Sequence, residues 1–316
     1  MTHVQDEMRT VPRVAFLTLV CYPLLQIRFL ICAYLVPSKI ATGGSRSVSL
    51  GANYNHQVYI EDTDTFGVVY NANYPLYIER AMGVHFALSS SNPRIVKFKS
   101  LKYKAPARLG DKLEVEVTAN RKNPALMNAK VLKRKSEDIE ISTCIGMEYQ
   151  ETLSRLDGSG EKFRNDKFGQ HNAVHTSQFD LYWDEKTHIG TLSTGTIFKL
   201  FERARTNALG GADLLLELCS GNAHVYVARV SDYEIVRDID VDSTHVVVKS
   251  MYEPLGSLEG GVSMINFHQY VCDVSDMTIL SRAIVTCSCV DTLTRRATTF
   301  PNQIAKIFFQ LEKVQG

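Results

Sequence analysis

The stretch VYIEDTDTFGVVYNANYPLYIERAMGVHFAL, residues 58–88, decides the fold because a second, diverged copy of it follows later in the chain. That copy, LYWDEKTHIGTLSTGTIFKLFERARTNAL, occupies residues 181–209 and aligns with the first without a gap. Gly67 then matches Gly190, and both copies keep the triplet Glu-Arg-Ala. Such a repeat predicts two copies of one structural unit. A single mixed α+β domain would leave the repeat unexplained.

Each copy is expected to form a short strand, a loop centred on glycine and a helix. In the first copy, apolar residues recur at helical spacing and fill most positions between, which is typical of a buried helix. Asn73 is a suitable N-cap for this helix, and Thr194 or Thr196 is suitable in the second copy. Strand-length segments follow each helix, at residues 95–104, 112–121, 125–135 and 139–150, then 225–236, 244–252, 262–271 and 278–290.

The sequence therefore predicts an α+β protein with two tandem domains, each an antiparallel sheet wrapped around a central buried helix. We place the first domain at residues 46–155 and the second at residues 175–316. The polar, Gly-Ser-Gly-containing residues 156–174 are a predicted linker.

The N-terminal part differs in character from the two domains. Residues 14–36 form an almost unbroken apolar run, long enough to span a bilayer. Arg28 near its centre opposes a transmembrane helix, because a charge is costly in hydrocarbon. We expect residues 1–45 to be an apolar leader or anchor. Membrane contact, targeting to an organelle, a cytoplasmic location and a non-functional extension all remain open.

Composition excludes several classes of function. The chain has 35 basic and 34 acidic side chains and a net charge of +1, so a nucleic-acid partner is not expected. The sequence has no Gly-x-Ser-x-Gly elbow, dinucleotide fingerprint or metal-ligand cluster, so no serine hydrolase, cofactor or metal is predicted. The seven scattered cysteines are expected to be free thiols.

The run at residues 58–81 resembles the signature of the 4-hydroxybenzoyl-CoA thioesterase branch of the hotdog superfamily. In that family an acidic-Thr-Asp-x-x-Gly-(Val/Ile)-Val-(Tyr/Phe) stretch opens the central helix. Residues 103–113 and 290–301 are similar to later landmarks of such thioesterases. The resemblance implies two hotdog domains fused as a pseudo-dimer, with further homo-oligomerisation open. It implies hydrolysis of an acyl or aroyl thioester of CoA or of an acyl carrier protein.

The resemblance also implies the site. Asp64 matches the catalytic aspartate, as nucleophile or as general base on water. Amides near Tyr70 and Asn71, at the helix N-terminus, would polarise the thioester carbonyl. Many relatives have histidine in place of Asn71. The predicted substrate-binding residues are Gly67, Val68, Val69, Ala72, Asn73 and Glu79.

Two carboxylates near this motif have competing interpretations. Asp62 is expected to hydrogen-bond the loop rather than react. Glu79 is a rival attacking group, because some hotdog thioesterases use a helix glutamate. A structural contact between the halves is favoured for it, since both copies keep Glu-Arg-Ala. Residues 133–135 are basic and could contact CoA phosphates, although a solvated strand end is favoured.

The second copy is degenerate. Thr187 stands where the first copy has Asp64, and Glu185 stands at the position of Asp62. A replacement pair of Glu185 and His188 is disfavoured. We therefore predict one competent site, lined in part by the second domain. Two alternatives remain: a non-catalytic acyl-thioester binding or scaffold protein in which both sites have decayed, and acyl transfer to an acceptor other than water.

Overall fold

The computed structural model describes residues 51–64, 67–85, 94–119, 126–135, 138–150, 156, 160–164, 174–187, 190–219, 223–240, 242–257, 261–294 and 296–310. The apolar run at residues 14–36, the leader boundary at residue 45 and His188 lie outside them. None of the helices in the described part of the chain is long and apolar enough to cross a membrane.

Two halves follow each other in the same element order. The first consists of β1 (Gly51–Gln57), η1 (Ile60–Asp62), α1 (Asn73–His85), β2 (Arg94–Tyr103), β3 (Lys112–Ala119), β4 (Leu126–Lys135) and β5 (Asp138–Gln150). The second consists of β6 (Val174–Asp180), η3 (Trp183–Glu185), α2 (Thr194–Ala208), α3 (Ala212–Cys219), β7 (Ala223–Ile235), β8 (His245–Ser257), β9 (Gly261–Asp273), β10 (Ile279–Asp291), β11 (Ala297–Thr298) and α4 (Asn302–Gln310).

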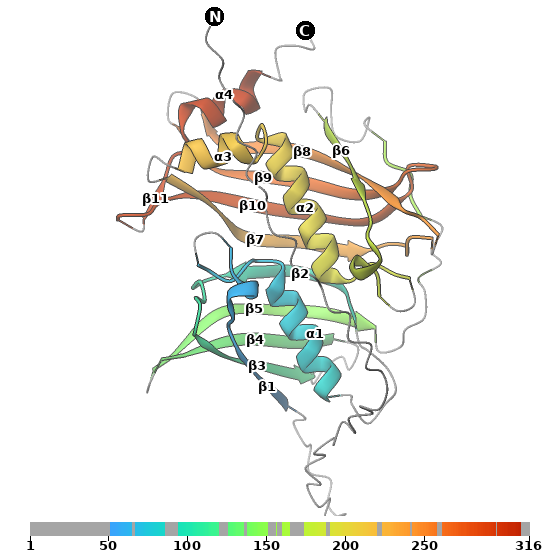
Figure 1. Cartoon of the computed structure of the whole chain (residues 1–316), viewed down its shortest axis with the longest axis vertical. Coiled ribbons are helices and arrows are strands. Elements are labelled where there is room, and N and C mark those ends of the chain that lie inside the picture. Colours follow the sequence, from blue (N-terminus) through green and yellow to red (C-terminus); the bar gives the residue numbers. More distant parts are fainter. Residues whose placement is uncertain are drawn as a thin grey trace, which may run out of the picture. The chain divides into compact units, whose positions relative to one another are not determined.

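The strands form one antiparallel sheet in the order β1-β3-β4-β5-β2-β7-β10-β9-β8-β6, and β11 pairs with β10. The halves join where β2 pairs with β7, from Lys97↔Glu234 to Lys102↔Arg229. α1 packs on strands of the first half and α2 on strands of the second, and the two helices also contact each other (Figure 1). The chain thus has the predicted α+β class, a double hotdog.

The central helices are buried on the sheet side but not all round. In α1, Tyr77, Ile78 and Ala81 are fully enclosed, whereas Arg80 is exposed and Val84 is 55% exposed. The sequence predicted a helix that is buried on nearly all sides. That prediction was wrong for the face of α1 that carries Arg80 and Val84. Of the seven cysteines, Cys272, Cys287 and Cys289 are described with their side chains, and each is a buried free thiol.

The helix starts differ from those predicted. α1 begins at Asn73 itself, whose side-chain amide donates to the Asp62 carbonyl at 3.0 Å and ties the helix to the preceding turn. The N-cap of α2 is Ser193, whose hydroxyl accepts from the Thr196 amide at 3.0 Å. Thr194 is instead fully buried and directed toward the first half.

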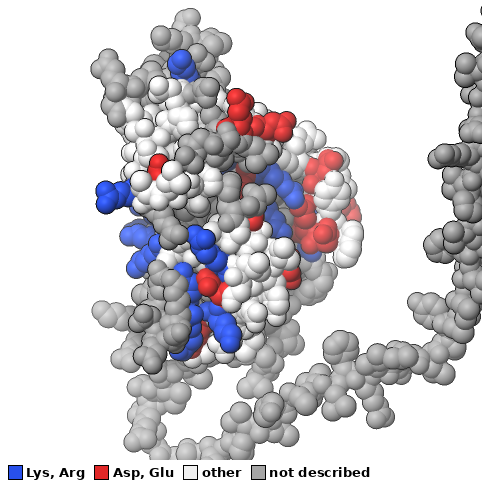
Figure 2. Space-filling model, turned by 60° about the vertical axis from the view of Figure 1, so that its left-hand side comes forward, with Lys and Arg blue, Asp and Glu red and all other residues white. Residues whose placement is uncertain are grey.

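A buried ion pair reinforces the junction of the halves. Arg94 at the start of β2 donates to both carboxylate oxygens of Asp238, at 2.6 and 3.1 Å. Asp238 also accepts from the Leu156 amide at 2.7 Å, so one carboxylate connects β2, the predicted linker and the segment after β7. The surface carries patches of both charges, in keeping with the net charge of +1 (Figure 2).

Candidate active site

The loop between η1 and α1 holds the Asp64 carboxylate in a fixed position. The Asp64 amide donates to the Val68 carbonyl at 2.8 Å, and the Val68 amide returns a bond to Asp64 Oδ1 at 3.2 Å. Gly67 has a φ of 68°, in the left-handed region that glycine adopts without strain. Hydrogen bonds between Asp64 and Val68 thus orient the carboxylate.

The second half repeats this turn without the carboxylate. The Thr187 amide donates to the Thr191 carbonyl at 2.7 Å, and the Thr191 amide donates to Thr187 Oγ1 at 3.2 Å. Gly190 has a φ of 77°. Thr187 therefore takes the place of Asp64 with the same hydrogen bonding but no acid or base function.

Asp62 has the structural role expected for it. Its Oδ2 atom accepts from the Tyr59 amide at 2.9 Å and lies 2.9 Å from His56 Nε2. Burial opposes ionisation of Asp62, but these hydrogen bonds outweigh it and hold the pKa of the carboxyl below its ordinary value. Asp62 thus braces the turn.

The amides at the start of α1 are not equivalent. The Tyr70 amide donates to the Asp62 carbonyl at 2.9 Å, so it is already engaged. The amides of Asn71 and Ala72 donate to no backbone carbonyl among the described residues. The Tyr103 hydroxyl donates to the Asn71 carbonyl at 3.0 Å, which fixes the peptide that joins Asn71 to Ala72. Of these two residues, Asn71 lines the cavity described next, whereas Ala72 is fully buried, so the Asn71 amide is the one placed to meet a ligand.

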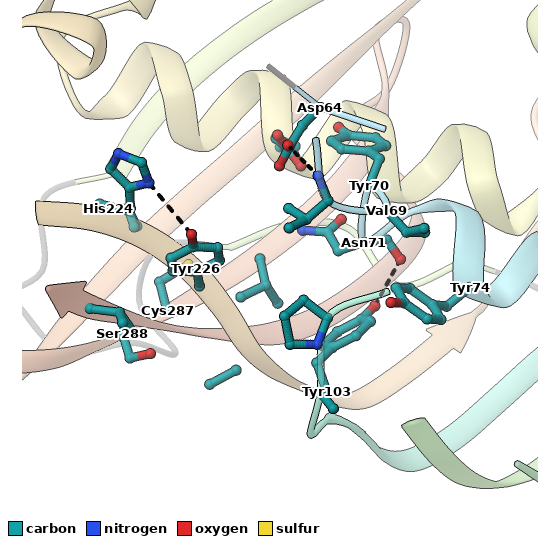
Figure 3. Close-up of a pocket in the computed structure, with 18 of the residues that line it drawn as sticks. Asp64, Val69, Tyr70, Asn71, Tyr74, Tyr103, His224, Tyr226, Cys287 and Ser288 are labelled. Carbon is teal, nitrogen blue, oxygen red and sulfur yellow. Dashed lines mark hydrogen bonds between the residues drawn. The ribbon is translucent and has the colours of Figure 1, made fainter. Parts of the chain in front are cut away.

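A cavity of about 880 Å³ opens at this point, between the two halves. The loop and α1 side contributes Asp64, Val68, Val69, Tyr70, Asn71 and Tyr74 to its lining. The second half contributes Glu202, Arg205, Leu209 and Leu215, with residues of β7 and β10. Figure 3 shows Asp64 and Asn71 on one side of the pocket and Tyr226 and Cys287 on the strands across from them.

The cavity reaches both faces of the sheet because β2 ends there. β2 stops at Tyr103, and residues 223–228 of β7 pair only with β10 among the described residues. Successive strand residues point to opposite faces. Val227 and its partner Cys287 face the helices and the core, whereas Tyr226 and its partner Ser288 face the other side. On β7 and β10, therefore, the cavity-lining residues that face the helices are apolar, and those that face the other side are polar.

Glu202 of α2 is a second carboxylate in this cavity, and its position was not predicted. Burial raises the pKa of Glu202 above its ordinary value, although Arg205 favours the charged form. Tyr70 and Asn71 lie against the same carboxyl from the first half. The Glu-Arg-Ala triplet that both copies keep was the only sequence feature that pointed to Glu202. The sequence does not show that α2 of the second half carries Glu202 to the cavity beside Asp64 of the first half.

Beside the second copy, the place that corresponds to the Asp64 cavity is closed by contacts between the two halves. There Glu79 accepts hydrogen bonds from the Thr194 hydroxyl and, at 3.1 Å, from the Ile95 amide of β2. Thr191 and Thr194 are fully buried. Burial raises the pKa of Glu79 to about 7, although both hydrogen bonds favour its charged form. Glu202 thus faces an open cavity beside the first copy, whereas its counterpart Glu79 is in direct contact with Thr194 beside the second copy.

The predicted site residues therefore divide into two groups. The cavity is lined by Asp64, Val68, Val69, Tyr70 and Asn71. The remaining four, which do not line it, are Gly67, Ala72, Asn73 and Glu79.

Of the basic residues 133–135, Lys133 and Arg134 are described with their side chains, and both have partners. Lys133 is buried and donates to the Pro106 carbonyl at 3.1 Å, and Arg134 pairs with Glu114. The favoured expectation of a solvated strand end was therefore wrong for Lys133. The exposed cations that line the cavity are Lys104 and Arg108. No cluster of three metal-ligating side chains is found in the part of the chain that the structure describes.

Comparison with known proteins finds similarity to thioesterases in the first half of the chain. Residues 66–141 match the family model named Thioesterase superfamily. The acyl-CoA thioester hydrolase YbgC of Escherichia coli is 40% identical over 76 residues, which are 21% of this chain and 57% of that protein. The chain thus spans little more than half the length of this curated relative.

Solved structures resemble the whole double unit. A putative oleoyl thioesterase from Lactobacillus plantarum superposes with a TM-score of 0.53 over 77% of this chain and 97% of its own, at 8% identity. The dehydratase domain from the CurJ module of curacin polyketide synthase gives 0.50 over 79% and 96%, also at 8%. These likenesses show the hotdog fold. Because the fold serves hydrolases and dehydratases alike, the chemistry depends on the site.

Proposed function

We propose that this chain is an acyl-CoA thioesterase of the 4-hydroxybenzoyl-CoA type, with one competent site. The observation that carries the proposal is the meeting of the Asp64 carboxylate, the start of α1 and a partly apolar cavity in one place. The sealed counterpart around Glu79 and Thr194 supports a single site. The match of residues 66–141 and the YbgC relative support thioester hydrolysis.

In the proposed reaction the thioester carbonyl oxygen meets the amide of Asn71, where the N-terminus of α1 favours developing negative charge. As a general base, Asp64 accepts a proton from water while the hydroxide adds to the carbonyl carbon. Collapse of the tetrahedral intermediate breaks the carbon–sulfur bond, and the thiolate takes the proton. As a nucleophile, Asp64 would instead form an anhydride that water opens. Both routes release acid and free thiol.

The substrate is proposed to enter with its acyl group on the apolar side of the cavity. The CoA portion would extend out of the cavity beside the exposed Lys104 and Arg108, whose positive charges suit phosphate groups. An acyl-carrier-protein thioester shares the same phosphopantetheine chemistry and is the alternative donor.

Thiol release from short-, medium- and long-chain acyl-CoAs and an aroyl-CoA tests the proposal on the full chain and on Asp64→Asn. We expect turnover that falls about 100-fold or more in the variant, as is usual when a base or attacking group is lost. Unchanged turnover in Asp64→Asn would move the chemistry to Glu202 or elsewhere. The rival function is a binding or scaffold role, favoured by Asn71 standing where many relatives have histidine. Acyl-CoA binding without turnover would establish it.

A further inference from the structure

The apolar side of the cavity has a distinct wall formed by the second half. Leu209 follows α2, Leu215 lies in α3, and both line the cavity with Val225, Val227 and Cys287. None of these five side chains carries a charge. If the thioester carbonyl lies at Asp64, as the proposed function requires, an acyl group that avoids water must extend along this wall.

A pair of glycines positions α3 on this wall. Gly210 and Gly211 have φ values of 97° and 98°, in the left-handed region, and so turn the chain sharply after α2. A Cβ at Gly210 would lie 2.6 Å from Leu214 Cδ2, so α3 packs against the turn itself. α3 then contacts both α2 and β7.

One face of α3 is directed inward. Ala212, Asp213 and Glu217 are exposed, whereas Leu214 and Leu215 are half-buried and pack against the core. Of the two leucines, only Leu215 lines the cavity. The two neighbours therefore separate two roles: Leu214 holds α3 on the core, and Leu215 forms part of the cavity wall.

The longer helix-to-strand connection lies beside the open site. Residues 209–222 join α2 to β7 and include α3, whereas the shorter segment 86–93 joins α1 to β2. The connection of the second half is thus the longer one, and its residues Leu209 and Leu215 lie at the cavity that also contains Asp64.

We propose that α3 limits the acyl chamber and that Leu215 is the residue that determines how long an acyl group the site accepts. The favoured substrate is then an apolar acyl group with no charge at its far end. This inference rests on the proposed function, since it assumes that the acyl group lies on the helix side of the cavity.

The experiment measures kcat/KM for straight-chain acyl-CoAs of increasing length with the full chain and with Leu215→Ala, Leu215→Trp and the matched control Leu214→Ala. Affinities for non-hydrolysable acyl-CoA thioethers of the same lengths are measured in parallel. Each buried methylene contributes about 0.8 kcal/mol, roughly fourfold. We expect Leu215→Ala to move the optimum two to three carbons longer, with about tenfold better kcat/KM there, and Leu215→Trp to move it shorter.

An optimum that stays in place in both Leu215 variants would overturn the inference. So would an equal displacement in Leu214→Ala, because loosening of α3 would then explain the effect. Should Leu215→Ala fail to fold, Leu215→Val and Leu215→Trp carry the same comparison. A wild-type chain that binds the thioethers but hydrolyses no thioester would refute the proposed function alone, and the affinity series would still decide the role of Leu215.

Discussion

At the scale of single residues, the proposed reaction depends on how Asn71 is held at the start of α1. The Tyr103 hydroxyl donates to the Asn71 carbonyl at 3.0 Å. Burial raises the pKa of Tyr103 well above its ordinary value, so the hydroxyl stays protonated and remains a donor. Tyr103 comes from the end of β2, which makes the strand a support for the start of α1.

Removal of this hydroxyl should therefore lower the rate more than the affinity. We expect Tyr103→Phe to reduce kcat about fivefold to tenfold with little change in KM, because a net hydrogen bond contributes about 1 kcal/mol. The exposed Tyr182, changed to Phe, is the control for the assay. A kcat within twofold of wild type in Tyr103→Phe would show that the peptide does not need this support.

Sequence could single out Asp64 as a candidate but could not reveal its surroundings. Asp64 was predicted from the resemblance of a contiguous run, and the turn around it depends on bonds within five positions. Tyr103 and Glu202 reach the same cavity from distant elements, which no local pattern reveals. The bond from the Tyr70 amide to the Asp62 carbonyl likewise depends on the exact path of the loop, which the sequence pattern does not give.

At the scale of elements, the two central helices lie in opposite surroundings. α2 presents Glu202 to an open cavity, and α1 presents Glu79 to the closed contact with Thr194 and Ile95. The sequence predicted both central helices and the four strands that follow each of them. It was wrong about the short strand expected at the start of each quoted copy, because η1 and η3 lie there and β1 and β6 precede the two copies. It did not predict α3 or α4, because neither has a counterpart in the quoted repeat.

The buried Glu79 should make stability depend on pH. Its pKa of about 7 in the folded chain lies above the ordinary value of 4.5, so folding favours the protonated form. The stabilisation is complete below about pH 4.5 and is lost as the pH rises through about 7. We expect Glu79→Gln to be more stable than wild type at pH 8, by about 1–3 kcal/mol, and to flatten the decline between pH 5 and 8.

Denaturant unfolding of both proteins across this pH range checks the prediction. The variant Glu61→Gln, at an exposed carboxyl of η1, serves as the control. A wild-type stability that does not fall between pH 5 and 8 would contradict the assignment of Glu79 as a buried, raised-pKa group.

At the scale of the whole molecule, the proposed site exists only because the two halves are joined. The cavity takes its reactive side from the first half and much of its wall from the second. The junction includes the β2–β7 pairing and the Arg94–Asp238 ion pair. The sequence predicted this pseudo-dimer through the repeat, whereas the ion pair connects residues too far apart for any pattern to show.

Breaking the buried pair should destabilise the junction strongly. Asp238→Ala leaves the Arg94 guanidinium buried without its partner, which typically costs about 3–5 kcal/mol. Lys97→Ala removes an exposed pair with Glu234 across the same junction and should cost about 1 kcal/mol or less. Thermal and denaturant unfolding compare the two, and equal losses would mean that the buried pair has no special weight.

The measurement that tests the central claim most directly is kcat for thiol release in a matched pair of variants, Asp64→Asn and Thr187→Ala. The two residues occupy equivalent turns, one beside the open cavity and one beside the sealed contact. The account predicts a fall of about 100-fold or more in the first and a kcat within about twofold of wild type in the second, because the proposed reaction does not use the Thr187 turn. Comparable losses in both variants, or full activity in Asp64→Asn, would contradict a single site at Asp64.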